Sequence, residues 1–110
     1  HPPEAMAVRR EDGSWLLDGM LPVDEFHDLL DVGPLPDEER GYYQTLGGFV
    51  MMYLERTPEA GDRFTWDDLQ FEVLDMDGYR VDKVLVTPVA AGEEEKPRKF
   101  AQMGGPGQRD

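Results

Sequence analysis

The sequence predicts an α+β fold, a small sandwich in which a mixed or mainly antiparallel sheet is covered by two helices. Three observations carry this prediction. Two segments of helical period lie in the first half of the chain, three alternating segments lie in the second half, and two Asp-Gly pairs stand between apolar runs. A chain of 110 residues is enough for one domain with a modest core. The expected order of elements is ββααβββ.

The first two strands are predicted around the Asp-Gly pair at 12–13. Asp-Gly readily adopts the positive φ angles of a two-residue type I′ turn. In that register Val8 lies opposite Leu17, and Arg10 lies opposite Trp15 with its guanidinium along the indole.

Two amphipathic helices should follow. Pro22 suits the first turn of a helix over 21–30, whose apolar face would consist of Val23, Phe26, Leu29 and Leu30. After a proline-containing loop, Thr45 is a plausible N-cap for a second helix. Its apolar residues recur at helical spacing and are Leu46, Phe49, Val50, Tyr53 and Leu54.

Three strands are predicted in "RFTW", "LQFEVLDM" and "YRVDKVLV", where the period becomes alternating. The Asp-Gly pair at 77–78 indicates a second type I′ turn. The resulting register pairs Met76 with Tyr79, Asp75 with Arg80, Leu74 with Val81, Glu72 with Lys83 and Phe71 with Val84. One outer face near this turn, made of Leu74, Met76, Tyr79 and Val81, would then be apolar. It is either covered by another part of this chain, which is favoured, or left for a partner as a candidate interaction surface.

The "TLGGFV" stretch raises the question of a phosphate-binding loop. A dinucleotide fingerprint requires a third spaced glycine, and a P-loop requires a Gly-Lys-Ser/Thr ending. Neither is present, so Gly47 and Gly48 are interpreted as sites where the second helix closely approaches a neighbour.

The composition limits the partners and the chemistry. The net charge of -13 and a pI near 4.4 disfavour nucleic acid and anionic membrane surfaces. There is no cysteine, Ser14 is the one serine, and His27 borders an apolar helix face, where a partly buried structural role is expected. We therefore expect no enzyme.

Acidic residues supply the remaining candidate site. Asp67 and Asp68 share a tight loop and offer the oxygen ligands that Mg²⁺ or Ca²⁺ prefers, although the spacing does not match an EF-hand. Ordinary turn roles remain the alternative. Asp82 should point to the apolar face and be paired with Arg80.

The domain boundaries follow from composition. Residues 1–4 are expected to be a linker or an expression remnant, and 5–90 the folded domain. Residues 91–110 combine charge, Gly and Pro and are expected to form a flexible tail.

Three stretches, "DGSWLLDGMLPVDEFHDLL", "YQTLGGFVMMYLERTPEAGD" and "LQFEVLDMDGYRVDKVLV", together resemble the transporter-associated domain of CorC/HlyC proteins, known as magnesium and cobalt efflux proteins or hemolysins. The resemblance implies a parent chain with a membrane domain and a paired CBS module. It also implies that this soluble domain lies on the cytoplasmic side of the inner or plasma membrane. The implied fold is similar to part of FAD-binding domains, so FAD enters by analogy alone, and no catalytic or cofactor-binding residues are carried over.

The leading hypothesis is a non-catalytic regulatory or interaction domain of a divalent-cation transport protein, docking onto its CBS neighbour or onto a second copy. The alternative is direct sensing of a divalent cation on the acidic loops, or of an adenine or flavin nucleotide at the second helix.

Overall fold

A computed structural model describes residues 6–89 of the chain. The elements in order are β1 (Ala7–Arg9), β2 (Trp15–Asp18), α1 (Val23–Leu30), the 3-10 turn η2 (Glu38–Arg40), α2 (Leu46–Leu54), β3 (Arg63–Trp66), β4 (Leu69–Asp77) and β5 (Arg80–Pro88). The predicted ββααβββ order is confirmed, with η2 added inside the loop between the helices. The expected linker at 1–4 and tail at 91–110 lie outside the described residues.

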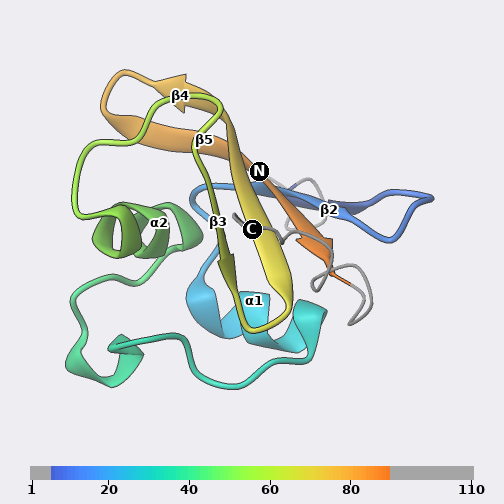
Figure 1. Ribbon diagram of the computed structural model, residues 1–110. Coiled ribbons are helices and arrows are strands. Elements are labelled where there is room, and N and C mark those ends of the chain that lie inside the picture. The colour runs from blue at the N-terminus through green and yellow to red at the C-terminus, as the bar shows by residue number, and fades with distance from the viewer. Residues whose placement is uncertain (1–5, 90–110) are drawn as a thin grey trace, which may run out of the picture.

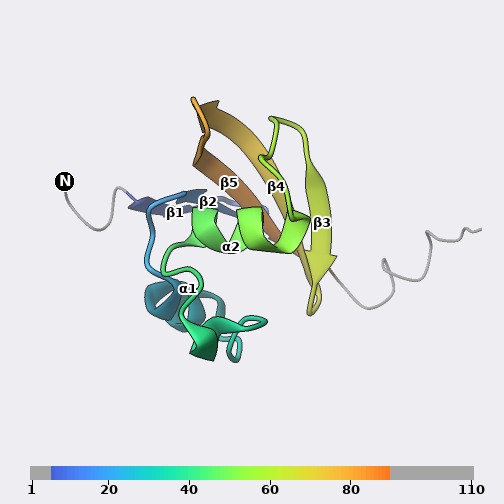
Figure 2. The same cartoon turned by 90° about the vertical axis from the view of Figure 1, so that its left-hand side faces the viewer.

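The five strands form one sheet in the order β1-β2-β5-β4-β3, and every neighbouring pair is antiparallel. β5 is central because β2 and β4 both bond to it. Figures 1 and 2 show α1 and α2 on the same side of the sheet. The molecule therefore has two layers, and the core lies between the helices and one face of the sheet.

The core is built by alternate residues of the strands together with the apolar faces of the helices. Phe49 of α2 is central to it and contacts the aromatic rings of both β3 and β4. The buried apolar residues are Leu17, Leu21, Val23, Phe26, Leu35, Tyr43, Leu46, Phe49, Val50, Leu69, Phe71, Val73, Val81, Val84 and Val86.

The register predicted for the first hairpin is wrong by one residue. The observed partners are Ala7 and Leu17, Val8 and Leu16, and Arg9 and Trp15. The loop has three residues instead of two, because Arg10 N–H donates to the Ser14 carbonyl at 2.8 Å and Gly13 N–H donates to the Arg10 carbonyl at 3.0 Å. Gly13 takes the positive φ of +91° that this loop requires. Arg9, and not Arg10, thus lies over the Trp15 indole, 5.8 Å from its centroid.

The register predicted for the β4–β5 hairpin is wrong by two residues along most of its length, so Glu72 and Phe71 pair with Leu85 and Val86 and not with Lys83 and Val84. Asp77 pairs with Arg80, so the turn residues are Gly78, at φ +66°, and Tyr79. A glycine at the first central position of a two-residue turn is as favourable as an Asp-Gly pair across both positions, and the sequence does not distinguish the two.

The same hairpin contains two compensating irregularities. Val73 pairs with Val84, Asp75 with Lys83, and Met76 with Val81, so Leu74 and Asp82 are left without a direct partner. Each extra residue reverses the side to which the following side chains point. As a result Val81 and Val84, three positions apart, both lie in the core.

The second helix begins where the sequence indicates, whereas α1 begins at Val23, with Pro22 as its N-cap and not in its first turn. The Thr45 side chain accepts a bond from Gly48 N–H at 3.2 Å, which confirms the predicted N-cap of α2. In α1, Val23 and Phe26 are buried and Leu30 packs against the core, but Leu29 is exposed. Leu29 is rotated by about 100° from Leu30 around the helix axis, which carries it off the face that meets the sheet.

Candidate functional site

The first turn of α2 is where a phosphate-binding loop would offer its N–H groups. The first two N–H groups are bonded to the chain around Gly19, and the next two are bonded to Thr45. In order, the donors and acceptors are Leu46 to Leu21 O (2.8 Å), Gly47 to Gly19 O (2.8 Å), Gly48 to Thr45 Oγ1 (3.2 Å) and Phe49 to Thr45 O (3.0 Å). The N–H groups of Leu46, Gly47 and Gly48, which a helix leaves unpaired, all have acceptors here, and Phe49 makes the first regular bond of the helix, so none of these donors is left for a phosphate.

The glycines of this turn are sites of close approach, as predicted. A Cβ on Gly47 would lie 3.0 Å from the Gly19 carbonyl oxygen and 3.2 Å from the Val81 Cβ. A Cβ on Gly48 would lie 2.9 Å from the Cβ of Tyr43. The pair therefore serves packing.

The tightest backbone contact beside this turn, at Gly19, was not predicted from the sequence. A Cβ on Gly19 would lie 1.9 Å from the Val81 carbonyl oxygen. This clash could be relieved only by a shift of the backbone. Gly19 N–H also donates to the Asp82 carbonyl at 2.9 Å. Gly19 stands after a strand like an ordinary turn glycine, and its role depends on β2 and β5 being neighbours. We name Gly19, Gly47 and Val81 the glycine crossing.

The predicted interaction surface is divided by the structure. Tyr79 is 83% exposed and Leu74 is 39% exposed, whereas Met76 is half-buried and packs against the core. The placement of Val81 on this outer face is wrong, because it is 1% exposed and belongs to the glycine crossing. We call Leu74 and Tyr79 the hairpin tip. That it binds a partner stays a prediction.

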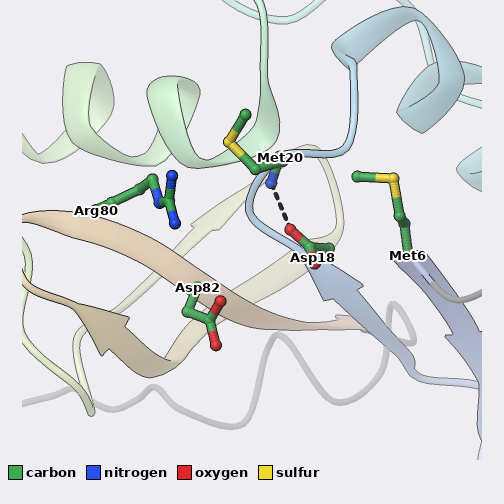
Figure 3. Close-up of a pocket in the computed structure, with 5 residues that line it drawn as sticks. All are labelled: Met6, Asp18, Met20, Arg80 and Asp82. Atoms are coloured by element: carbon green, nitrogen blue, oxygen red, sulfur yellow. Dashed lines mark hydrogen bonds between the residues drawn. The ribbon is translucent and has the colours of Figure 1, made fainter. Parts of the chain in front are cut away.

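A shallow hollow of about 320 Å³ lies beside the glycine crossing and is drawn in Figure 3. Its lining residues are Met6, Asp18, Met20, Arg80 and Asp82. Asp18 Oδ1 accepts a bond from Met20 N–H at 2.8 Å, which fixes the turn after β2. The lining thus combines flexible thioethers with charges of both signs.

The ion pairs around this hollow show that the predicted pairing of Asp82 with Arg80 is wrong. Asp82 is paired with Lys83, at 3.3 Å from Nζ to Oδ2, and Lys83 Nζ also lies 3.8 Å from Asp18 Oδ2. Arg80 was the expected partner of Asp82, but it pairs with Asp77 at 3.1 Å. The bulge at Asp82 is the cause, because it turns this side chain away from the strand position that alternation assigns.

Asp67 and Asp68 form the two-residue turn between β3 and β4, with Trp66 paired to Leu69 on either side. Both have positive φ angles, +51° and +63°, and both are exposed. This is the type I′ geometry that Asp tolerates, so the turn explains the two residues structurally. Within residues 6–89 no group of three or more His, Cys, Asp or Glu side chains could hold a metal ion. A cation on Asp67 and Asp68 stays a prediction.

His27 has the structural role expected of it. Its Nε2 lies 2.6 Å from Glu38 Oε1, which also accepts the Leu35 N–H at 2.9 Å. These bonds fasten the loop around η2 to α1. In the same loop Tyr43 O–H donates to the Pro36 carbonyl at 2.5 Å, and burial raises the pKa of Tyr43 to about 12, with Glu38 adding to the effect.

Hydrogen bonds and ion pairs lower the pKa of two carboxyl groups, those of Asp62 and Asp12. The pKa of Asp62 is lowered, first by the Arg56 guanidinium at 2.8 Å and then by Glu59 N–H. The pKa of Asp12 is lowered by bonds from the Ser14 hydroxyl and N–H. Because Ser14 donates to Asp12 within a turn, its hydroxyl has a structural partner. Of the described helices, none has the length and apolarity to cross a membrane.

The five-stranded antiparallel sheet with two helices on one face defines a two-layer α+β domain. A model of the CorC/HlyC family, described as the transporter associated domain, matches residues 8–90. The chain belongs to this family.

The relatives that match this chain carry different names. The chain is 55% identical over 83 residues to a UPF0053 protein of Synechocystis and 40% identical over 86 residues to the polyamine export protein of Escherichia coli K12. These matches cover 76% and 78% of this chain. They cover 18% and 19% of the relatives, so the chain spans about a fifth of their length.

Solved structures show the same fold. The transporter associated domain of a Xylella fastidiosa hemolysin, solved in complex with Mg²⁺ and Mn²⁺, is 36% identical with a TM-score of 0.67, and the match covers 77% of this chain and 99% of that one. The corresponding domain from Nitrosomonas europaea is 31% identical with a TM-score of 0.69, over 76% and 96% of the two chains. The family is a transporter-associated domain and not a known catalytic family.

Proposed function

We propose that this chain is a non-catalytic interaction domain that regulates a membrane export protein, and that it docks onto another part of that protein through the hairpin tip. The observation that carries this proposal is the exposure of Tyr79, 83%, at the end of the long β4–β5 hairpin. Aromatic side chains are common anchors of interfaces, because they bury a large area with few rotamers to fix.

The surroundings of Tyr79 suit a docking role. Leu74 adds apolar surface, and the exposed Asp77 and Arg80 pair across the turn at 3.1 Å. Polar groups around an apolar anchor are the usual arrangement at the rim of an interface. Val81, two residues after Tyr79, is packed at the glycine crossing, so the hairpin is attached to the folded domain directly below its tip.

A catalytic role has little support from the described residues. The Ser14 hydroxyl donates to Asp12, and His27 is paired with Glu38, so each is held by a structural partner. A serine nucleophile requires a histidine within hydrogen-bond reach, and these bonds direct both groups elsewhere.

The cargo proposed for the longer protein is a cation. Relatives at 40% identity are named polyamine export proteins, which favours an organic polycation. Magnesium or cobalt, the expectation from the family resemblance, appears in the name of a structure that is 19% identical and shares the fold alone. We therefore propose polyamine export as the process that this domain regulates.

The partner we propose is a CBS module of the parent protein or a second copy of this domain, on the cytoplasmic side of the membrane. The described residues 6–89 carry 19 Asp and Glu against 7 Lys and Arg, so a basic patch on the partner would be attracted to this domain.

The docking proposal is tested with Tyr79→Asp and with Tyr42→Asp as the matched control, since Tyr42 is 65% exposed on a different segment. Self-association is measured by sedimentation, and binding to a CBS module added in trans is measured by calorimetry. Tyr79→Asp is expected to weaken the association at least tenfold, which corresponds to about 1.4 kcal/mol, and Tyr42→Asp to leave it unchanged. Equal affinities of the two variants would remove the hairpin tip from the interface.

A second candidate function is binding of a divalent cation, favoured by the Mg²⁺ and Mn²⁺ complex of the 36% identical relative. The turn of Asp67 and Asp68 offers carboxylates from adjacent residues. Calorimetry with MgCl₂ and MnCl₂ on Asp67→Asn and on Asp77→Asn, a control at an exposed carboxylate at the end of β4, tests it. Saturable binding that only Asp67→Asn abolishes supports the site, and an absence of heat in the unchanged chain overturns it.

A further inference from the structure

The hollow beside the glycine crossing adjoins the hairpin tip, because Arg80, which lines the hollow, directly follows Tyr79 in the sequence. The lining comes from three neighbouring segments (Figure 3), since Met6 lies before β1, Met20 follows β2, and Arg80 and Asp82 belong to β5. Met20 is 48% exposed and Met6 is half-buried. The molecule thus carries an exposed aromatic side chain next to a hollow lined by methionines.

The chemistry of the hollow matches a phenol. Thioethers make favourable contacts with aromatic rings, and a guanidinium such as that of Arg80 can lie along a ring face. The volume of about 320 Å³ is sufficient for one ring, since an apolar cavity of about 150 Å³ already admits benzene.

Asp82 supplies the acceptor that a phenol hydroxyl requires. Its Oδ2 lies 3.3 Å from Lys83 Nζ, whereas its Oδ1 has no hydrogen-bond partner within residues 6–89. Because Lys83 already pairs with this carboxylate, a neutral hydroxyl donor suits the free oxygen better than a second cation does.

Tyr79 is the side chain of this molecule that matches the hollow. It is 83% exposed, so its ring is available to another molecule. Within the described part of the chain, the other three tyrosine hydroxyl groups each take part in a hydrogen bond, whereas that of Tyr79 has no partner there. Tyr79 therefore combines a free ring with a free donor, and the hollow combines thioethers with a free acceptor.

We propose that two copies of this chain exchange their hairpin tips. Tyr79 of each copy packs its ring against Met6 and Met20 of the other copy and donates its hydroxyl to Asp82 there. A two-fold axis makes the two contacts equivalent, because each copy carries both halves of the contact on one surface. This inference rests on the docking role proposed for the hairpin tip, and it adds the surface that receives the tip.

The exchange is tested by sedimentation of the full chain. The described residues carry 12 more acidic than basic side chains, so about 0.3 M NaCl is added to screen the repulsion between copies. Met20→Glu places a charge in the hollow and is expected to weaken self-association by about tenfold or more. Leu29→Glu, at a position of α1 that is 37% exposed, is the matched control and should leave self-association unchanged. Both substitutions lie at exposed positions, and urea denaturation should show that both variants remain folded.

A mixture of two variants distinguishes an exchange from any other contact. In a mixed dimer of Tyr79→Asp and Met20→Glu, one of the two contacts is intact, because Tyr79 of one chain meets the unchanged hollow of the other. If both contacts contribute equally to a tenfold loss, the mixed dimer should form about threefold more tightly than either variant with itself, beyond the statistical preference for mixed pairs. A mixed dimer no tighter than the separate variants overturns the exchange.

Binding to a CBS module added in trans separates this inference from the proposed function. If Tyr79→Asp weakens that binding while neither variant alters self-association, the tip docks onto the module and the exchange between copies is wrong. If Tyr79→Asp weakens self-association and Met20→Glu does not, the tip still docks, but the hollow is not the surface that receives it, and the exchange is again overturned.

Discussion

The glycine crossing and the hairpin tip both include residues of the β4–β5 hairpin, yet they differ in almost every physical respect. Val81 and Tyr79 stand two positions apart in the sequence, and their side chains are 1% and 83% exposed. At the crossing, backbone meets backbone and no Cβ fits on Gly19. At the tip, a large aromatic side chain faces solvent.

This difference arises from the unpaired residues in β4 and β5. In a regular strand Tyr79 and Val81 point to the same side, and Val84 points to the other. The extra residue at Asp82 moves Val81 to the side of Val84, so the apolar residues nearest the turn are shared between the core and the surface. One bulge can therefore bury half of the residues that the sequence pattern assigns to the surface.

The largest expected effect is that of Gly19→Ala. The new Cβ would lie 1.9 Å from the Val81 carbonyl oxygen, and backbone cannot move aside as a flexible side chain can. We expect a loss of about 3 kcal/mol in the free energy of unfolding, at the upper end for overpacked sites, measured by urea denaturation.

Gly33→Ala is the control for this substitution, because no heavy atom lies within 4 Å of the added Cβ. It should change the free energy of unfolding by less than about 1 kcal/mol, in the stabilising direction, since alanine restricts the unfolded chain. A Gly19→Ala protein as stable as Gly33→Ala would mean that β2 and β5 do not cross as described.

The next effect contrasts the two residues of the hairpin directly. Val81→Ala removes two buried methyl groups and is expected to cost about 2 kcal/mol, whereas Tyr79→Ala should stay within about 0.5 kcal/mol. Thermal denaturation of both variants measures the difference. If Tyr79→Ala were the more destabilising, the residue would be part of the packing and the hairpin tip would not be a free surface.

Much of the fold follows from local patterns in the sequence. The helical period of Leu46, Phe49 and Val50 and the cap at Thr45 describe α2 correctly, and the alternation in the second half describes β3, β4 and β5. These features depend on neighbours within a few residues, so they can be interpreted without knowledge of the tertiary structure.

The parts that could not be predicted depend on contacts between distant segments. Both hairpin registers were wrong because Asp-Gly pairs fit more than one turn, and the correct turn depends on which residues the core requires. Gly19 was missed since its partner is 62 positions away in the sequence. The hairpin tip was predicted in part, for Leu74 and Tyr79, because exposure there does not depend on the bulge.

A smaller effect is expected for Tyr43→Phe, beside the crossing. The substitution removes the bond to the Pro36 carbonyl and should cost about 1 kcal/mol at pH 7. The pKa of Tyr43 is raised to about 12, so the unfolded chain loses this proton first and the unchanged protein becomes less stable as the pH rises above about 10. Urea denaturation from pH 8 to 12 should show a weaker alkaline fall for Tyr43→Phe, while Tyr79→Phe at the tip keeps the full fall.

The smallest effect compares two Arg–Asp ion pairs, a partly buried one in the loop before β3 and an exposed one at the tip. Arg56 holds Asp62 at 2.8 Å and lowers the pKa of that carboxyl, whereas Arg80 and Asp77 meet at 3.1 Å with both side chains more than half exposed. A lowered pKa gives stability that is present above the ordinary Asp pKa of about 3.9 and is lost as the pH falls below it. The urea midpoint of Asp62→Asn should therefore fall less steeply between pH 5 and 2 than that of the unchanged chain, and Asp77→Asn should follow the unchanged chain. If both variants flattened the acid profile equally, the Arg80–Asp77 pair would stabilise the fold as much as the Arg56–Asp62 pair does. The tip would then be part of the folded core structure and not a surface available to a partner.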